Sequence, residues 1–214
     1  MKNYSAEEMK TIYETRRKRL ADFMKQNNVS AAVFEDSEEH RDASVRYFCG
    51  HISDGILIID SDAKSVLIPW DINLANENAF ADKIIPFTRY ERDNVRAIKA
   101  VLSAFQKKQK LVVEIPPTSS YLLFLKIVDA LPDWDVRCRE NGCHKFTTAM
   151  RAIKDEYEIE CTKEAARIGD KIIDEIEQRI KKGKIKTETD VALFIESECR
   201  KYGCEKTGFD TLAA

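Results

Sequence analysis

Three histidines and six cysteines are the side chains of this sequence with the greatest capacity for chemistry. The histidines are His40, His51 and His144, and none is four residues from another, the spacing of a metal-binding pair on one helix. The cysteines lie at positions 49, 138, 143, 161, 199 and 204. Two cysteine pairs are five residues apart, whereas zinc sites use tighter spacings such as C-x2-C. We therefore interpret the cysteines as small buried apolar residues.

Motifs of the common catalytic classes are missing from the sequence. It has no H-E-x-x-H, no G-x-x-x-x-G-K-[ST] and no G-x-G-x-x-G. GHISDG (50–55) places Ser53 one residue too late for a nucleophile elbow, so we interpret this serine as a turn residue. Asp36, Glu38 and Glu39 are interpreted as the exposed acids of a polar loop. The residues alone thus predict no catalytic centre and no metal site in this chain.

The overall charge narrows the possible partners. The 214 residues are 43% hydrophobic and 34% charged, with a net charge of −2, which is typical of a globular protein with a real core. This balance argues against binding to nucleic acid or a membrane surface. The run Arg16–Arg19 is an exception that we interpret as the solvent-exposed face of a helix. With no targeting segment in view, we expect a cytoplasmic protein.

The first two thirds of the chain combine strand-like and helix-like patterns. Residues 5–28 begin with a capping box, Ser5 and Glu8, and continue as an amphipathic helix. Short apolar runs predict strands at 30–34, 55–60, 65–69, 83–87, 111–115 and 134–138, with helices at 72–81, 91–108 and 118–131. Only residues 61–64 separate the second and third strands, which predicts an antiparallel hairpin. Residues 1–148 are therefore predicted to form an α/β domain with a mixed sheet covered by helices.

The last third, residues 149–214, has no strand-like run until its end. Two amphipathic helices are predicted, the first ending at Gly183 and the second beginning at the capping box of Thr187 and Asp190. Two such helices cannot bury both apolar stripes against each other and still form an independent domain. We therefore expect this unit to be incomplete, with EKTGFDTLAA (205–214) leading into a further strand.

Five segments carry a resemblance to a known family, and one of them, SVLIPWDINLANENA (65–79), resembles the strand, acidic turn and Ala-containing helix of that family, with Asp71 at the acidic position. SVRYFCGHISDGILII (44–59) resembles a segment near the start of Xaa-Pro aminopeptidases, prolidases and creatinase, and RRKRLADFMKQNNVSAAVF resembles the family's opening helix and strand. MRAIKDEYEIECTKEAARIGD (150–170) is similar to the family's linker, and the final 32 residues resemble the section that follows it. The resemblance implies a creatinase/prolidase-type N-terminal α/β domain, a helical linker and the first helices of an incomplete pita-bread (α+β) domain.

The resemblance also implies where the chemistry of the family lies. In the peptidases the pita-bread domain holds two divalent metal ions (Mn, Co or Zn) on two Asp, one His and two Glu, all of them beyond the segment that matches FDTLAA. We therefore expect this chain to be the non-catalytic N-terminal portion of a proline-specific metallopeptidase. On this reading it has no catalytic residues, and only the full-length parent binds the peptide substrate.

The resemblance further implies a homodimer in which loops of the N-terminal domain wall the active site of the neighbouring subunit. His51 and Asp54 are the candidates for this substrate-binding role, and the alternative for His51 is a turn histidine that is bonded locally. Two other functions stay open. One is a non-catalytic binding or assembly module of the same architecture, and the other is a creatinase-type amidinohydrolase that uses no metal.

Overall fold

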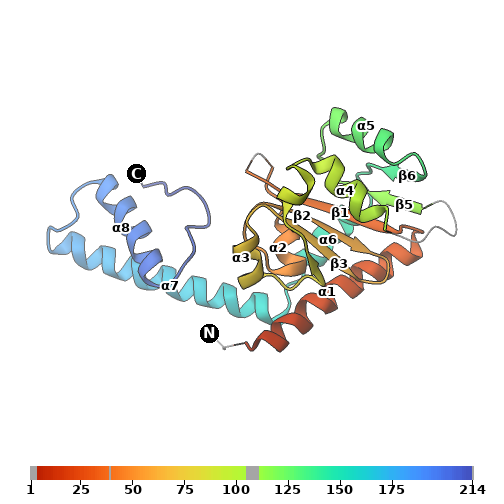
Figure 1. Cartoon of the computed structure of the whole chain (residues 1–214). Coiled ribbons are helices and arrows are strands. Elements are labelled where there is room, and N and C mark those ends of the chain that lie inside the picture. Colours follow the sequence, from red (N-terminus) through yellow and green to blue (C-terminus); the bar gives the residue numbers. More distant parts are fainter. Residues whose placement is uncertain (1–3, 39, 105–110, 214) are drawn as a thin grey trace. The chain divides into compact units, whose positions relative to one another are not determined.

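The computed structural model describes residues 4–38, 40–104 and 111–213. These residues form two compact units, and the boundary between them along the chain falls between Ile153 and Lys154. Figure 1 shows the elements of both units. The helices of the first unit are α1 (Ala6–Gln26), α2 (Ala43–Cys49), α3 (Ile72–Asn78), α4 (Asn94–Leu102), α5 (Tyr121–Ala130) and α6 (Cys143–Ala152). Its strands are β1 (Ala31–Asp36), β2 (Gly55–Asp60), β3 (Ser65–Pro69), β4 (Lys83–Ile84), β5 (Leu111–Glu114) and β6 (Trp134–Arg137), and a 3-10 turn, η1, spans Phe87–Tyr90.

The six strands form one mixed sheet in the order β4-β3-β2-β1-β5-β6. β2 pairs antiparallel with both β1 and β3, and the remaining neighbours pair in parallel. The short β2–β3 connection makes the predicted hairpin, and the parallel pairs are joined through helices, as parallel connections require. The predicted α/β class with a mixed sheet flanked by helices is therefore confirmed.

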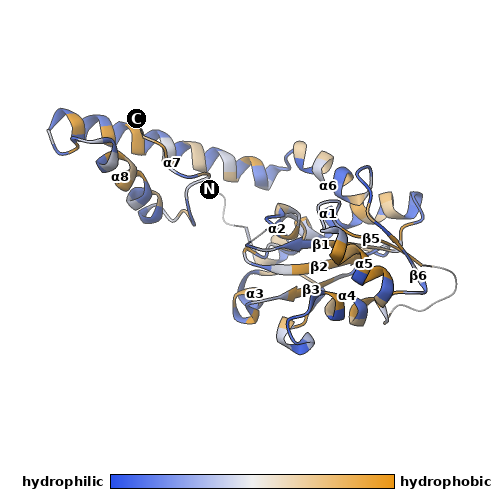
Figure 2. Ribbon diagram, turned by 90° about the horizontal axis from the view of Figure 1, so that it is seen from above, coloured by the Kyte–Doolittle hydropathy of each residue, from blue (hydrophilic) through white to orange (hydrophobic). Residues whose placement is uncertain are grey.

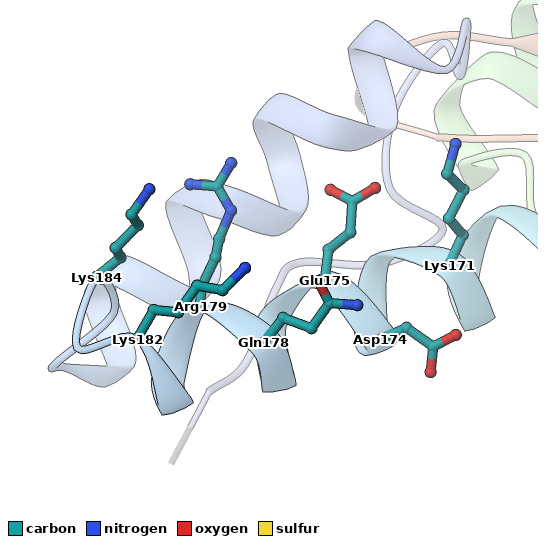
Figure 3. Close-up of a pocket in the computed structure, with 7 residues that line it drawn as sticks. All are labelled: Lys171, Asp174, Glu175, Gln178, Arg179, Lys182 and Lys184. Atoms are coloured by element: carbon teal, nitrogen blue, oxygen red, sulfur yellow. The ribbon is translucent and has the colours of Figure 1, made fainter.

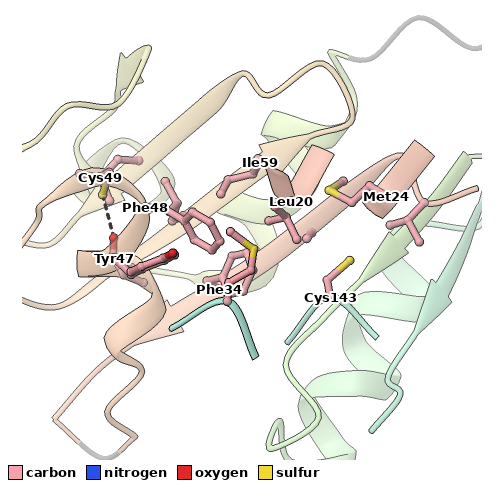
Figure 4. Close-up of a cluster of buried hydrophobic side chains, with 14 of the residues drawn as sticks. Leu20, Met24, Phe34, Tyr47, Phe48, Cys49, Ile59 and Cys143 are labelled. Atoms are coloured by element: carbon pink, nitrogen blue, oxygen red, sulfur yellow. Dashed lines mark hydrogen bonds between the residues drawn. The ribbon is translucent and has the colours of Figure 1, made fainter. Parts of the chain in front are cut away.

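Alternation along the central strands divides the core between two faces of the sheet. Phe34 and Leu57, which lie opposite each other in β1 and β2, contact α1, α2 and α6 on one face (Figure 4). Val33 and Ile58 belong to the cluster that α4 and α5 cover on the other face. Neither face of β1 and β2 is left to solvent, so both strands are almost entirely buried and each carries a run of apolar residues, as in doubly covered sheets.

The first helix begins as predicted, but its basic run does not lie on a solvent-exposed face. Ser5 and Glu8 form the capping box through both hydrogen bonds, 3.2 and 2.8 Å long. Arg16 and Arg17 are buried, whereas Lys18 and Arg19 are exposed. The interpretation of the whole run as a solvent-exposed face was therefore wrong for two of its four residues, and their partners are described with the candidate site.

Several element boundaries differ from those predicted. The strand predicted at 83–87 is only two residues long, because Pro86 has no N–H for a ladder bond and the 3-10 turn follows it. The helix predicted at 91–108 begins at Asn94, where the side chain of Asp93 caps it, and ends at Leu102; residues 105–108 lie outside the described part. Helices α2 and α6 were not predicted as separate elements.

The second unit contains α7 (Glu156–Lys181) and α8 (Glu188–Lys201). The capping box of Thr187 and Asp190 is present, and Gly183 follows the end of α7 with a positive φ of 64°, as predicted. A small apolar cluster joins the two helices around Ile168, Ile172 and Phe194. Figure 2 shows hydrophobic and hydrophilic residues alternating along both helices. Other apolar side chains of this unit are exposed: Ile173, Ile180, Leu193, Phe209 and Leu212.

A substitution of Phe34 tests whether this residue belongs to the buried core. Its ring is fully buried and lies 5.2 Å from the ring of Phe48, so Phe34→Ala should lower the free energy of unfolding by about 3–5 kcal/mol. Phe209→Ala is the matched control, since the Phe209 side chain is 82% exposed and its loss should change stability by less than about 0.5 kcal/mol. Urea unfolding followed by circular dichroism measures both, and equal effects would contradict the assignment.

Candidate functional site at the end of helix α2

The predicted site residues follow α2, so the end of this short helix determines where they lie. A helix leaves its last four carbonyl groups without partners inside the helix. Here Gly50 N–H donates to Arg46 at 2.8 Å, and Phe80 N–H donates to Cys49 at 2.7 Å. The other two carbonyls, those of Tyr47 and Phe48, accept bonds of 2.9 Å from the side chains of Arg16 and Arg17 respectively. All four carbonyls are therefore satisfied, two of them by buried arginines.

Arg17 also ties the end of α2 to the segment after α3. Its guanidinium donates to the carbonyl of Phe80 at 3.0 Å and lies 3.6 Å from the carboxylate of Asp82. Burial lowers the pKa of Arg17, while the Asp82 charge acts in the opposite direction and helps to keep the guanidinium charged. Arg16 adds a cation–π contact, with its guanidinium 4.3 Å from the centre of the Tyr47 ring.

Gly50 ends α2 in the left-handed conformation, with φ at 79°. A Cβ on this residue would lie 2.9 Å from the hydroxyl of Tyr13 and 3.0 Å from the carbonyl of Asn78. Both the backbone angle and the close approach therefore require glycine. The turn that follows carries the two residues singled out from the sequence, His51 and Asp54.

His51 is fully buried, and its contacts are local. Its Nε2 lies 3.3 Å from the carbonyl of Asp54, which only accepts, so Nε2 carries the proton and Nδ1 is left as an acceptor. Nδ1 is buried with no hydrogen-bond partner among the described residues. Burial lowers the pKa of His51, and the bond to Asp54 only partly offsets this. His51 is thus a neutral imidazole built into the turn.

Asp54 lies beside His51 but turns its carboxylate towards the loop after β1. Arg41 donates to this carboxylate at 2.5 Å and lies 3.4 Å from Asp36, whose side chain also accepts the N–H of Asp42 at 3.0 Å. The Asp54 carbonyl additionally accepts the N–H of Trp70 at 3.1 Å. One residue thus links the α2 turn, the loop after β1 and the end of β3.

A groove opens where these loops meet, and the sequence reading did not predict it. It has a volume of about 540 Å³ and is lined by Ser37, Glu38, Trp70, Phe87, Thr88, Arg92 and Asn94. The Trp70 ring stacks on Phe87 with ring centres 5.5 Å apart and is 44% exposed, so it presents a flat apolar surface next to charged groups. Such a surface can bind a side chain or ring but supplies no nucleophile. The sequence signal for it was a lone Trp at the end of an apolar strand.

The two fully buried cysteines do not supply a nucleophile either. Cys49 and Cys143 are fully buried, as predicted, and burial raises the pKa of the Cys49 thiol to about 12 and raises that of Cys143. Both are therefore protonated at neutral pH. The same prediction was wrong for Cys138, which is exposed, and Cys161, Cys199 and Cys204 are only partly buried. All six cysteines lie in the described part of the chain and are free.

A buried carboxylate, that of Glu114, lies at the end of β5 and contacts the first residue of α6. Gly142 lets it approach the start of that helix, since a Cβ there would fall 2.1 Å from the carboxylate. Burial alone would raise the pKa of Glu114, but bonds from Arg139 and from the N–H of Cys143 outweigh burial and lower it. Glu114 is thus an ionised residue that caps a helix and leaves no free carboxylate for acid–base chemistry.

Metal binding was tested against the side chains present. Within residues 4–38, 40–104 and 111–213, no three His, Cys, Asp or Glu side chains are grouped so that they could hold a metal ion. These residues therefore do not fit the two-metal centre that the family resemblance implies. None of the described helices combines the length and apolar character needed to cross a membrane.

The second unit has a hollow of its own beside α7, with seven polar or charged residues around it (Figure 3). Three of these residues already contact α8 or the residue that ends it, and one of the three is Lys171, whose ammonium lies 4.3 Å from the centre of the Tyr202 ring. Glu175 accepts the hydroxyl of Tyr202 at 2.7 Å, and the Arg179 guanidinium lies 4.3 Å from the centre of the Phe194 ring. We interpret the hollow as the solvent-facing side of the α7–α8 contact.

Two curated proteins align with most of this chain. The Xaa-Pro dipeptidase of Pyrococcus horikoshii is 24% identical over 204 residues, which are 92% of this chain and 51% of that protein. The Xaa-Pro dipeptidase of Pyrococcus furiosus is 25% identical over 211 residues, 93% of this chain and 52% of that protein. The chain thus spans about half the length of these relatives. No family model matches the sequence.

Solved structures agree with the alignment. The X-Pro aminopeptidase of Thermotoga maritima superposes with a TM-score of 0.72 at 25% identity, covering 91% of this chain and 51% of that one. The prolidase of Pyrococcus furiosus gives 0.68 at 23% identity, covering 91% and 55%. The relatives and structural neighbours are Xaa-Pro dipeptidases, prolidases and Xaa-Pro aminopeptidases. The resemblance read from the sequence is therefore confirmed.

A third neighbour is described in more detail by its own name. The X-prolyl aminopeptidase of Caenorhabditis elegans is called a cytosolic enzyme with a di-nuclear active site, and it superposes with a TM-score of 0.53 at 15% identity. The match covers 88% of this chain but 31% of that one, so it supports the fold alone.

A substitution of Arg17 tests whether its hydrogen bonds to the end of α2 stabilise the fold. Arg17→Met keeps the apolar stem but leaves the carbonyls of Phe48 and Phe80 without their donor, and we expect the free energy of unfolding to fall by about 3 kcal/mol. The neighbouring exposed residue provides a control, because Arg19→Met should shift stability by no more than about 0.5 kcal/mol. Urea titrations of the two variants decide between this assignment and the solvent-exposed face first inferred.

Two histidines, the fully buried His51 and the partly buried His144, predict a pH dependence of stability. Burial lowers the pKa of both His51 and His144, so the unfolded chain binds protons more readily. Stability is therefore full above the unfolded pKa of about 6.5 and is lost as the pH falls below it. His51→Gln should flatten this loss below about pH 6.5, and a second change, His144→Gln, should flatten it further. An unchanged slope in the double variant would contradict the neutral assignment.

Proposed function

We propose that this chain is the non-catalytic N-terminal portion of a proline-specific metallopeptidase, whose full-length form hydrolyses Xaa-Pro bonds. The observation that carries the proposal is the joint match to Xaa-Pro dipeptidases in sequence and to prolidases and Xaa-Pro aminopeptidases in fold. The match extends over about nine tenths of this chain and about half of each relative. The activity and the substrate accordingly belong to the longer parent.

In this proposal the dinuclear centre, with Mn, Co or Zn, lies in the part of the parent outside this chain. The C. elegans neighbour is named as having a di-nuclear active site, and we propose a centre of the same kind in the parent by analogy. The exposed apolar side chains of the second unit, among them Ile173 and Leu193, are suited to burial by that missing part. A cytoplasmic location is proposed by the same analogy.

The role proposed for the first unit is to shape the wall of an active site and to associate with a second copy of the chain. His51 and Asp54 act in this role from inside the turn, because His51 is buried and Asp54 is tied to Arg41. The exposed side chains in and beside this turn include that of Ile52 within it and those of Arg41 and Trp70 next to it. In this proposal the wall that a substrate would contact includes Ile52, Arg41 and Trp70, and Asp54 holds the last two in place through its carboxylate and its carbonyl.

A direct test is to assay the purified 214-residue chain with Xaa-Pro dipeptides and added Mn, Co or Zn. We expect neither turnover nor stoichiometric metal binding by calorimetry, since the described residues hold no grouped metal ligands. A full-length prolidase assayed in parallel verifies the substrates and the metal loading. Metal-dependent hydrolysis by the chain alone would refute the proposal, and metal-free hydrolysis of creatine would favour the creatinase-type alternative.

A further inference from the structure

The two edges of the sheet differ in how open they are. β4, at one edge, is two residues long, and short edge strands offer little template for further pairing. β6, at the other edge, is four residues long and pairs with β5 on one side only. Its outer side is therefore the longer of the two sheet edges in the part of the chain that the structure describes.

The backbone of β6 shows which of its groups face this open side. Ile115 N–H donates to the carbonyl of Arg137 at 2.9 Å, so Arg137 and, by alternation along the strand, Asp135 direct their backbone groups towards β5. The N–H and C=O of Val136 therefore point outwards. Within the described residues neither of these two groups has a hydrogen-bond partner. A second strand laid along β6 would meet a donor and an acceptor at Val136.

We propose that β6 pairs antiparallel with β6 of a second copy of this chain, about a two-fold axis that passes between the two Val136 residues. In antiparallel pairs, residues that exchange both hydrogen bonds alternate with residues that exchange none. With Val136 opposite Val136 as the bonded pair, the outward donor and acceptor of each copy meet their counterparts in the other. The sheet then continues through the interface without a break.

The side chains of β6 are self-complementary in this same register. Pairing centred on Val136 places Asp135 opposite Arg137 of the second copy and Arg137 opposite its Asp135. These pairs occupy the positions without backbone bonds, where facing side chains lie closest, and opposite charges there are stabilising. Within one copy Arg137 Nε already donates to Asp135 at 2.8 Å. Two copies therefore bring together four charges of alternating sign, a pattern that selects a second copy of this chain as the partner.

Helix α5 adds an apolar surface next to the same edge. Four of its large apolar side chains are notably exposed: Tyr121 at 75%, Leu122 at 62%, Leu125 at 38% and Val128 at 37%. The opposite side of α5 packs against β6 and α4. A two-fold axis perpendicular to the sheet keeps both copies of α5 on one face, so the two helices come to lie on either side of the seam. Their exposed apolar side chains then have a surface to pack against.

This inference rests on, and deepens, the self-association that is part of the proposed function, because it names the surface involved. The test uses two opposite charge changes in the whole chain. Asp135→Arg makes the edge entirely positive at these positions, and Arg137→Asp makes it entirely negative. Each variant alone faces like charges across the axis, whereas one copy of each restores both opposite-charge pairs.

Sedimentation equilibrium of the wild-type chain over the micromolar range should give a dimer. Each single variant should raise the dissociation constant at least about tenfold, and an equimolar mixture should recover a heterodimer. Lys163→Glu is the matched control, since it disrupts an exposed ion pair with Glu160 on α7 and should leave the dimer intact. Thermal unfolding of each variant establishes that the chain remains folded.

A wild-type chain that stays monomeric overturns both the surface and the proposed self-association. A dimer that tolerates both single changes, or a mixture that fails to recover, overturns the β6 surface and leaves self-association standing. The peptidase assay is independent of all these outcomes. Failure of this inference is therefore distinguishable from failure of the proposed parent activity.

Discussion

The first unit depends on how the last turn of α2 is satisfied. A seven-residue helix is too short to be stable by itself, and its terminal carbonyls must find donors once they are buried. The sequence provides these donors from two directions, with Arg16 and Arg17 from α1 and the N–H of Phe80 from the segment after α3. Because one turn joins three segments, the loop that follows it has a fixed position rather than the freedom of a surface loop.

The same turn shows why the buried arginines are tolerated. Desolvating a guanidinium is expensive unless its N–H groups are bonded and its charge is balanced. Arg17 donates to two carbonyls and lies near Asp82, which is itself anchored by bonds of 2.7 and 2.9 Å from Ser65. The charge is thus dispersed over a network that reaches β3. Arginine suits this role better than lysine, since a planar fork of five donors can serve several acceptors at once.

The sequence was sufficient where a signal is local. The capping boxes at Ser5 and Thr187 and the glycine after α7 were each predicted from a few adjacent residues and are present. The strands were found because doubly covered strands form continuous apolar runs. The hairpin of β2 and β3 followed from loop length alone. These features need no knowledge of what packs against them.

The sequence was insufficient where the signal depends on distant partners. Arg16 and Arg17 are indistinguishable from Lys18 and Arg19 until α2 is placed against α1, since only then do two carbonyls face them. Helix α2 was missed although Asp42 and Gly50 stand at its ends as cap residues, because its stretch was read as a family motif and not as an element. Burial of His51 has the same origin, because its surroundings come from several segments.

These contacts show how polar and titratable side chains can hold loops in place instead of being available as reactive groups. His51 is neutral and enclosed, Asp54 is bound to Arg41, Glu114 is bound to Arg139, and the buried thiols are protonated. Each of these polar groups is committed to holding a turn, a helix end or a loop. Catalytic groups need the opposite condition, a free position and a pKa near the working pH. The same contacts that rigidify the loops around Trp70 therefore suit them to position a partner surface, because a wall is useful only if its shape does not change.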